Sequence, residues 1–194
     1  MTHRPILTER QRNDLMTLPT DDSSMLTYYI LSDEDIIRIK QKRDDHNQLG
    51  FALQLCALRY PGRYLNADDI LPKELIDFIG VQIGLSEIQI LKFTYKSVTR
   101  YEHLRVLQQH YGYRPFRRFE AKFVIWLTQA AIKTRNNAEL AVLFVEECRK
   151  RKIILPGITV IERLCADARV AAEREIVGCI ASRLDERMKK NLHA

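Results

Sequence analysis

The chain contains little glycine and little proline. Its 194 residues include only 7 Gly and 6 Pro, the residues that turns use most often. A fold of many short strands needs frequent turns, and no segment shows the alternation of apolar and polar residues typical of a strand. The composition therefore predicts an all-α fold with long helices.

Long apolar runs are also missing from the sequence. No run of about 18 uncharged apolar residues occurs, so we expect no membrane-spanning helix. Residues 1–5 lack the apolar stretch of a signal peptide, which predicts a cytoplasmic protein. The cysteines form no CxxC pair and have no histidine at ligand spacing, which predicts reduced, buried thiols. They are Cys56, Cys148, Cys165 and Cys179.

Catalytic motifs are absent as well. The sequence has no nucleophile elbow, no phosphate-binding loop and no metal-ligand spacing. The carboxylates at 33–35 and 44–45 stand at expected helix starts, where acidic residues act as caps. His103 and His110 share a helix face, but no third ligand is evident. We therefore predict no catalytic residue, no metal site and no cofactor in this chain.

Positive charge is concentrated in the middle of the chain. Residues 92–152 carry 14 Lys and Arg against 5 Asp and Glu, a net charge of +9, whereas the whole chain carries +6. The net charge is −4 over residues 1–91 and +1 over residues 153–194. A solvated surface rarely departs so far from neutrality, so the pattern predicts a polyanionic partner such as double-stranded DNA.

Capping residues and apolar spacing predict a series of helices. Capping boxes are expected at residues 8–11, 86–89, 99–102 and 159–162. Pro61 and Gly62 end the most apolar helix, because proline breaks the hydrogen-bond ladder and glycine tolerates the turn. The expected helices cover residues 9–16, 24–30, 33–43, 45–60, 72–83, 86–96, 99–111, 118–134, 137–150 and 160–190.

The organisation that we expect is two small helical subdomains with helix-turn-helix-like units, followed by a long C-terminal helix. Gly84 suits the end of one expected helix and Ser86 opens the next, so we expect the least packed boundary there, between DNA-binding subdomains 1–84 and 85–194. The last helix has no strong stop signal, which would suit a piece of a longer polypeptide. Its apolar stripe comprises Ile161, Cys165, Ala168, Ala172, Ile176, Ile180, Leu184 and Met188.

The junction of the helices expected at 33–43 and 45–60 is the first candidate DNA-binding site. In a helix-turn-helix, the second helix presents its N-terminal residues to base edges. Asn and Gln suit adenine, and Arg and Lys suit guanine or phosphate; caps and solvated charges are the alternative interpretation. The candidates at this junction are Lys40, Lys42, Arg43, His46, Asn47 and Gln48.

Further candidates flank the Pro61–Gly62 turn and fill the basic middle of the chain. Arginines beside the turn are either phosphate clamps or structural caps. Cations near the first turn of the helix expected at 99–111 lie where backbone N–H groups also bind phosphate. Tyr111, Tyr113 and Phe116 either stack on bases or, as we favour, anchor a loop to the core. These candidates are Arg59, Arg63, Lys96, Arg100, His103, Arg105, Arg114, Arg117, Arg118, Lys122, Arg149, Lys150, Arg151 and Lys152.

Four stretches of the sequence resemble one family. HNQLGFALQLCALRYPGR at 46–63, TRYEHL at 99–104, GYRPF at 112–116 and LPG followed by ERL at 155–164 occur in order. Together, residues 31–164 resemble the N-terminal region of Tn-three-family (TnpA-type) replicative transposases. The resemblance implies binding to transposon terminal inverted repeats during DNA transposition and recombination.

The same resemblance implies that strand cleavage and joining belong to a Mg²⁺-dependent RNase-H-like domain with three catalytic acidic residues. No residue here matches that triad, so we expect a DNA-binding piece that is not itself an enzyme. Two other functions remain open. The long C-terminal helix predicts a protein-interaction module that can self-associate, and a truncated regulator could compete for transposon ends.

Overall fold

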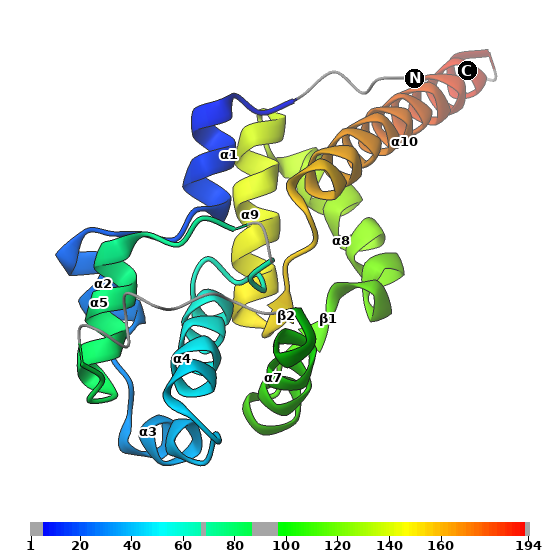
Figure 1. The fold of residues 1–194 in the computed structure, drawn as a ribbon. Helices are drawn as coiled ribbons and strands as arrows, with labels where there is room; N and C mark the ends of the chain where they lie inside the picture. The colour runs from blue at the N-terminus through cyan, green and yellow to red at the C-terminus, as the bar shows by residue number, and fades with distance from the viewer. Residues whose placement is uncertain (1–5, 67–68, 87–96, 193–194) are drawn as a thin grey trace. The chain divides into compact units, whose positions relative to one another are not determined.

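The computed structural model describes residues 6–66, 69–86 and 97–192, and this part of the chain is mostly helical (Figure 1). The helix predicted at 86–96 and the candidate Lys96 lie largely outside the described residues. The helices are α1 (Glu9–Met16), α2 (Asp22–Tyr28), α3 (Asp33–Lys40), α4 (Asp45–Arg59), α5 (Lys73–Gln82), α7 (Ser97–Tyr111), α8 (Glu120–Lys133), α9 (Asn137–Lys150) and α10 (Ile158–Leu192). A 3₁₀ turn, η1 (Phe116–Arg118), precedes α8, and the short strands are β1 (Arg114–Pro115) and β2 (Ile153–Ile154).

Contacts within the chain define two compact units that interleave along the sequence. Unit 1 contains the described residues up to Asn13, Phe116–Glu147 and the residues from Pro156 onward; unit 2 contains Asp14–Pro115 and Cys148–Leu155. These units do not follow the division at residue 84, because α7 packs against α4 inside unit 2. The assignment of two DNA-binding subdomains to 1–84 and 85–194 stays a prediction.

The centre of unit 2 is α4, which contacts α3, α5 and α7 (Figure 1). Asp44 caps the helix by accepting a hydrogen bond from the Asn47 backbone N–H at 2.8 Å. Residues 48–58 are all buried, so this part of the helix is enclosed by the core on every side. The helix ends as predicted before Pro61, and Gly62 adopts a φ of 106° that other residues rarely accept.

Two short strands in unit 2 were not predicted. β1 and β2 pair in parallel, with Arg114 opposite Ile153 and Pro115 opposite Ile154. Residues 113–116 were expected to form a loop and 153–155 an extended connector, and each contributes two residues to this ladder. The pairing joins segments far apart in sequence, so no local alternation could reveal it. The all-α prediction holds except for this ladder.

Unit 1 is built around α8 and α10, which pack against each other. Phe116, Phe123 and Phe144 form its aromatic centre, with ring centroids 5.2–5.6 Å apart. The predicted stripe of α10 is buried from Ile161 to Ala172, where it belongs to this core. Farther along the helix the stripe is exposed, at Ile176, Ile180 and Leu184.

Local details differ from the sequence predictions in several places. Helix α3 ends at Lys40 rather than at residue 43. Helix α2 begins at Asp22, capped by Asp21, rather than at Ser24. Helices α7 and α10 each begin before their predicted capping box, so Thr99 and Thr159 lie inside a helix. Cys179 is exposed, whereas the other three cysteines are buried as predicted.

Within the described ranges, no helix has the length and apolar character needed to cross a membrane.

Candidate nucleic-acid interface

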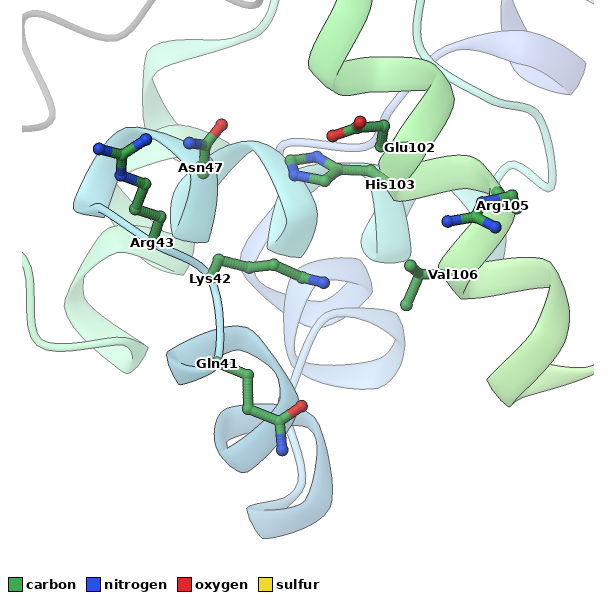
Figure 2. Close-up of a pocket in the computed structure, with 8 residues that line it drawn as sticks. All are labelled: Gln41, Lys42, Arg43, Asn47, Glu102, His103, Arg105 and Val106. Carbon is green, nitrogen blue, oxygen red and sulfur yellow. The ribbon is translucent and has the colours of Figure 1, made fainter.

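A basic pocket lies between the α3–α4 turn and α7 in unit 2 (Figure 2). Its volume is about 470 Å³. The turn and the first residues of α4 form one wall, and the middle of α7 forms the other. The residues that line it are Gln41, Lys42, Arg43, Asn47, Glu102, His103, Arg105 and Val106. Five of them were predicted as DNA-binding residues from two separate parts of the sequence.

Burial and neighbouring charge shift the pKa of two groups at this pocket. The Lys42 ammonium lies 4.3 Å from the centre of the Phe51 ring, and burial lowers its pKa while the charge of Glu102 opposes that shift. Burial also lowers the pKa of His103 to about 4, with smaller contributions from Lys42 and His46. The His103 ring is therefore neutral at pH 7, and it packs edge-on against Phe51.

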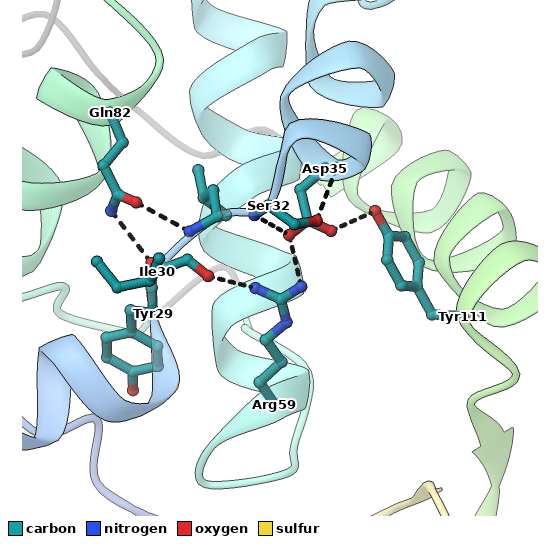
Figure 3. A network of polar contacts seen from close by, with 8 residues as sticks. Tyr29, Ile30, Ser32, Asp35, Arg59, Gln82 and Tyr111 are labelled. Atoms are coloured by element: carbon teal, nitrogen blue, oxygen red, sulfur yellow. Dashed lines mark hydrogen bonds and ion pairs between the residues drawn. The ribbon is translucent and has the colours of Figure 1, made fainter.

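The two walls of the pocket are held by a buried polar network (Figure 3). Asp35 at the start of α3 accepts hydrogen bonds from Arg59 at 2.6 Å, from the Tyr111 hydroxyl at 2.9 Å and from the Ser32 N–H at 2.7 Å. Burial raises the pKa of Asp35, but the hydrogen bonds and the charge of Arg59 outweigh it and leave the pKa below its ordinary value. One carboxylate thus ties together α3, α4 and α7.

The same network fixes the segment that leads into α3. The side chain of Gln82 accepts from the Leu31 N–H at 2.9 Å and donates to the Tyr29 carbonyl at 3.1 Å. Arg59 donates to the Ile30 carbonyl at 3.1 Å. Helices α4 and α5 therefore position the residues before α3, and through them the α3–α4 turn that carries Lys42 and Arg43.

The structure limits the predicted helix-turn-helix interpretation of this turn. Because α4 is buried from residue 48 onward, only its first turn can reach a DNA groove. Gln48, predicted to read bases, is itself buried, and its amide donates to the Lys42 carbonyl at 3.3 Å. The Asn47 amide donates to Asp44 at 2.9 Å. Lys40 and Arg43 are exposed, and His46 is half-buried.

Three predicted phosphate-binding arginines are engaged by the protein itself. Arg59 takes part in the Asp35 network. Arg63 pairs with Asp69 at 2.6 Å and donates to the Met16 carbonyl at 2.9 Å. Arg149 donates to the Pro61 carbonyl at 2.6 Å and the Leu15 carbonyl at 3.2 Å, and it stacks on Tyr60. For Arg59 and Arg63 the structural alternative considered for the sequence accounts for the side chain. Arg149 was expected either to bind phosphate or to lie at a solvated helix end, and it is instead bonded to two carbonyls.

A second group of cations lies where α9 ends. Lys150, Arg151 and Lys152 are exposed. Lys152, in the left-handed region at a φ of 51°, donates to the Tyr111 carbonyl at 3.1 Å. Arg114 donates to the Arg151 carbonyl at 3.0 Å. These contacts bring the basic run to the C-terminal end of α7, the helix that also lines the pocket.

The remaining predicted cations divide between the units. Arg100 is half-buried on α7, beside the ring of Tyr101. Arg117, Arg118 and Lys122 are exposed in unit 1.

The aromatic residues serve as anchors, as favoured from the sequence. Tyr111 donates to Asp35, Phe116 is buried and Tyr113 packs against the unit 2 core. Two residues here were not predicted from the sequence: Gln41, which lines the pocket, and Arg38, which lies 3.0 Å from His110 on α7. The basic character of Arg38 was the available signal, but nothing local marked its proximity to α7.

Comparison with known proteins places the chain in a family. The family model described as "Domain of unknown function (DUF4158)" matches residues 6–168. The chain belongs to the DUF4158 family. This DUF4158 chain is 33% identical over 193 residues to the transposase for transposon Tn501 of Pseudomonas aeruginosa. It is 32% identical to the transposase for transposon Tn21 and 26% identical to that for transposon gamma-delta, both of Escherichia coli.

These alignments cover most of the DUF4158 chain but little of each relative. The Tn501 and Tn21 alignments each cover 99% of this chain and 20% of the relative, and the gamma-delta alignment covers 87% and 17%. The chain therefore spans about one fifth of the length of these relatives. Its resemblance to the N-terminal region of Tn-three-family transposases is confirmed.

Side chains that could bind a metal ion do not cluster in the described part of the chain. No three His, Cys, Asp or Glu side chains gather there so that they could hold an ion. The candidate interface consists of cations and polar side chains, the chemistry of nucleic-acid binding.

Proposed function

We propose that this chain is a DNA-binding region of a Tn-three-family transposase and that it recognises the terminal inverted repeats of a transposon. The relatives are transposases, which act on DNA ends, and the basic residues of this chain are of the type that binds DNA phosphates. In this proposal, strand cleavage and Mg²⁺ binding belong to other parts of such a transposase. The protein would act in the bacterial cytoplasm, on the nucleoid.

The observation that carries the proposal is the arrangement of cations along α7. Lys42, Arg43 and Arg105 line the pocket beside the middle of α7, and Lys152 donates to the carbonyl of its last residue. A row of cations along one helix can neutralise several phosphates of a duplex, which supply most of the non-specific affinity. This row would supply affinity, and polar contacts from the same surface would choose the sequence.

The test is binding of the chain to duplex DNA, measured by fluorescence anisotropy across a salt series. One duplex carries the terminal repeat of the element that encodes the chain, and the other carries a scrambled sequence. We expect tighter binding to the repeat and a steep loss of affinity with salt. Equal affinity for both duplexes would contradict the proposed recognition of the repeat. No binding at low salt would contradict the proposed DNA-binding function.

A second function is favoured by the exposed apolar residues of α10. Val177, Ile180 and Leu184 are between 54% and 65% exposed at helical spacing, beyond the part of the stripe that packs in unit 1. Such a face suits a protein partner or a second copy of the chain, including one that competes with a full transposase for its ends. Sedimentation without DNA distinguishes this function, because self-association makes the mass depend on protein concentration.

A further inference from the structure

The pocket between the α3–α4 turn and α7 holds more positive charge than its own residues neutralise. Lys42, Arg43 and Arg105 line it, and Glu102 is the one carboxylate among the lining residues. In the described part of the chain, none of the three cations forms an ion pair. Cations held close together repel one another, so an anion that enters the pocket gains favourable interactions with all three.

The Lys42 ammonium is partly removed from water as well. It lies over the face of Phe51, and burial lowers its pKa. Beside it, His103 is only 4% exposed, and its Nδ1 has no hydrogen-bond partner among the described residues. A buried polar atom without a partner is unfavourable. Both features are expected where a polar ligand completes the hydrogen bonding of a site.

The donors at the start of α4 indicate that the ligand is a phosphate of the DNA backbone rather than the edge of a base. The amide of Asn47 and its backbone N–H are bonded to Asp44, and Gln48 is turned into the core. The side chains left at the pocket mouth are Arg43 and Arg105, which are exposed. Guanidinium and ammonium groups bind phosphate oxygens readily, and contacts to phosphate position a protein on DNA without reading the base sequence directly.

We propose that this pocket holds one backbone phosphodiester of the bound duplex, between Lys42 and Arg43 on the α3–α4 turn and Arg105 on α7. The inference rests on the proposed DNA-binding function and adds a defined contact to it. A pocket of about 470 Å³ is large enough for the phosphate together with the adjoining sugars. The contact fixes the register of the protein on DNA, and base discrimination comes from other residues.

The test compares the Lys42→Met and Arg105→Met variants with a Lys73→Met control. Lys73 is exposed in unit 2 but lies outside the pocket, so the control removes an equal charge. Circular dichroism first establishes that each variant is folded. Anisotropy then measures binding to the repeat duplex and to a set of duplexes in which one phosphate at a time is replaced by an uncharged methylphosphonate.

We expect each pocket variant to bind about tenfold more weakly than the control, on repeat and scrambled duplexes alike. One methylphosphonate position should weaken the unmodified protein by a similar factor and leave Arg105→Met unaffected, because that contact is already lost. If the protein binds DNA but the pocket variants have the same affinity as Lys73→Met, the proposed phosphodiester site is wrong, while the proposed DNA binding is not contradicted. If the unmodified protein binds no duplex, both proposals are overturned.

Discussion

Arg59 Nη2 lies 2.6 Å from Asp35 Oδ2, and the Asp35 side chain is only 2% exposed. The arginine belongs to the last turn of α4 and the aspartate to the first turn of α3. Because Tyr111 donates to the same carboxylate, the pair also reaches the end of α7. The α3–α4 turn and α7 form the walls of the basic pocket, so this ion pair supports the candidate interface without lying in it.

Replacing Arg59 with methionine should destabilise the protein strongly. The substitution leaves the Asp35 carboxylate buried without its charged partner, which typically destabilises a fold by about 3–5 kcal/mol. Arg59 is 26% exposed, so the lower end of that range applies. Urea denaturation followed by circular dichroism gives the free energy of unfolding.

Arg38→Met is the matched control, since Arg38 pairs with the exposed Glu34 at 3.0 Å on the same helix as Asp35. An exposed pair of this kind contributes under about 1 kcal/mol. Equal losses in Arg59→Met and Arg38→Met would show that the buried pair contributes no more than a surface pair.

The same carboxylate should make stability depend on acidity. Its pKa in the folded protein lies below its ordinary value of 3.8, so the unfolded chain binds the proton first as the pH falls. The stabilisation of the fold by the ionised Asp35 carboxylate is therefore complete above pH 3.8 and is lost as the pH falls below that value. The difference in unfolding free energy between the unmodified protein and Asp35→Asn should therefore be constant at higher pH and shrink below pH 3.8. A difference that does not change with acidity would contradict the ionised carboxylate.

His103 predicts a second pH dependence in a higher range. Burial lowers its pKa from 6.5 to about 4, so the folded protein resists protonation of the ring while the unfolded chain accepts it. Stability should decrease as the pH falls from 6.5 to 4, by at most about 3 kcal/mol. His103→Gln should flatten the unfolding free energy in this range. In Lys42→Met the ring should titrate at higher pH, because one of the charges that lowers its pKa is gone; NMR of the imidazole measures this shift.

Local signals in the sequence were sufficient for much of the helical structure. The Thr8–Gln11 box placed α1 at its observed bounds, and Ser32 with Asp35 forms a capping box at α3. Pro61 and Gly62 ended α4 as expected. These signals work because a cap and the helix that it starts are neighbours in sequence. The capping box predicted at Thr159 does not form: α10 already begins at Ile158, and Glu162 pairs with Arg12.

The candidate site was only partly predictable, because long-range contacts decide which cations remain available. The sequence identified the basic residues and gave Arg149 and Lys150 the same interpretation. The structure separates them, since Arg149 is bonded to carbonyls before and after α4 while Lys150 is exposed. Gln48 likewise has a polar side chain at the start of a helix, and nothing local shows that it faces the core. The pocket itself needs α3 and α7 side by side, which composition does not determine.

The exposed basic run should contribute to DNA affinity. Neutralising Lys150, Arg151 and Lys152 with glutamine should lower affinity for every duplex and reduce the salt slope by about 2–3. Arg149→Gln should instead lower the free energy of unfolding, because two buried carbonyls lose their donor. Anisotropy in a salt series and urea denaturation measure the two effects.

A control variant with glutamine at Arg10, Lys73 and Lys133 loses the same charge from exposed, scattered positions. Its salt slope should remain close to that of the unmodified protein. If this control weakens binding as much as the change at the basic run, the effect reflects net charge alone and the run makes no specific contact.

The ion pair between Arg12 and Glu162 should stabilise unit 1. Arg12 donates two hydrogen bonds to the Glu162 carboxylate, at 2.7 and 3.1 Å, and the Leu7 N–H donates a third at 3.1 Å. Glu162 is 7% exposed, so Arg12→Met leaves a buried carboxylate and should lower the unfolding free energy by about 2–3 kcal/mol. Arg163→Met is the control on the next residue of α10, because the Arg163–Glu120 pair is 3.4 Å long and exposed. The free energy of unfolding of this control should fall by under about 1 kcal/mol. If urea denaturation shows equal losses of unfolding free energy in Arg12→Met and Arg163→Met, the buried pair between Arg12 and Glu162 stabilises the fold no more than an exposed pair does.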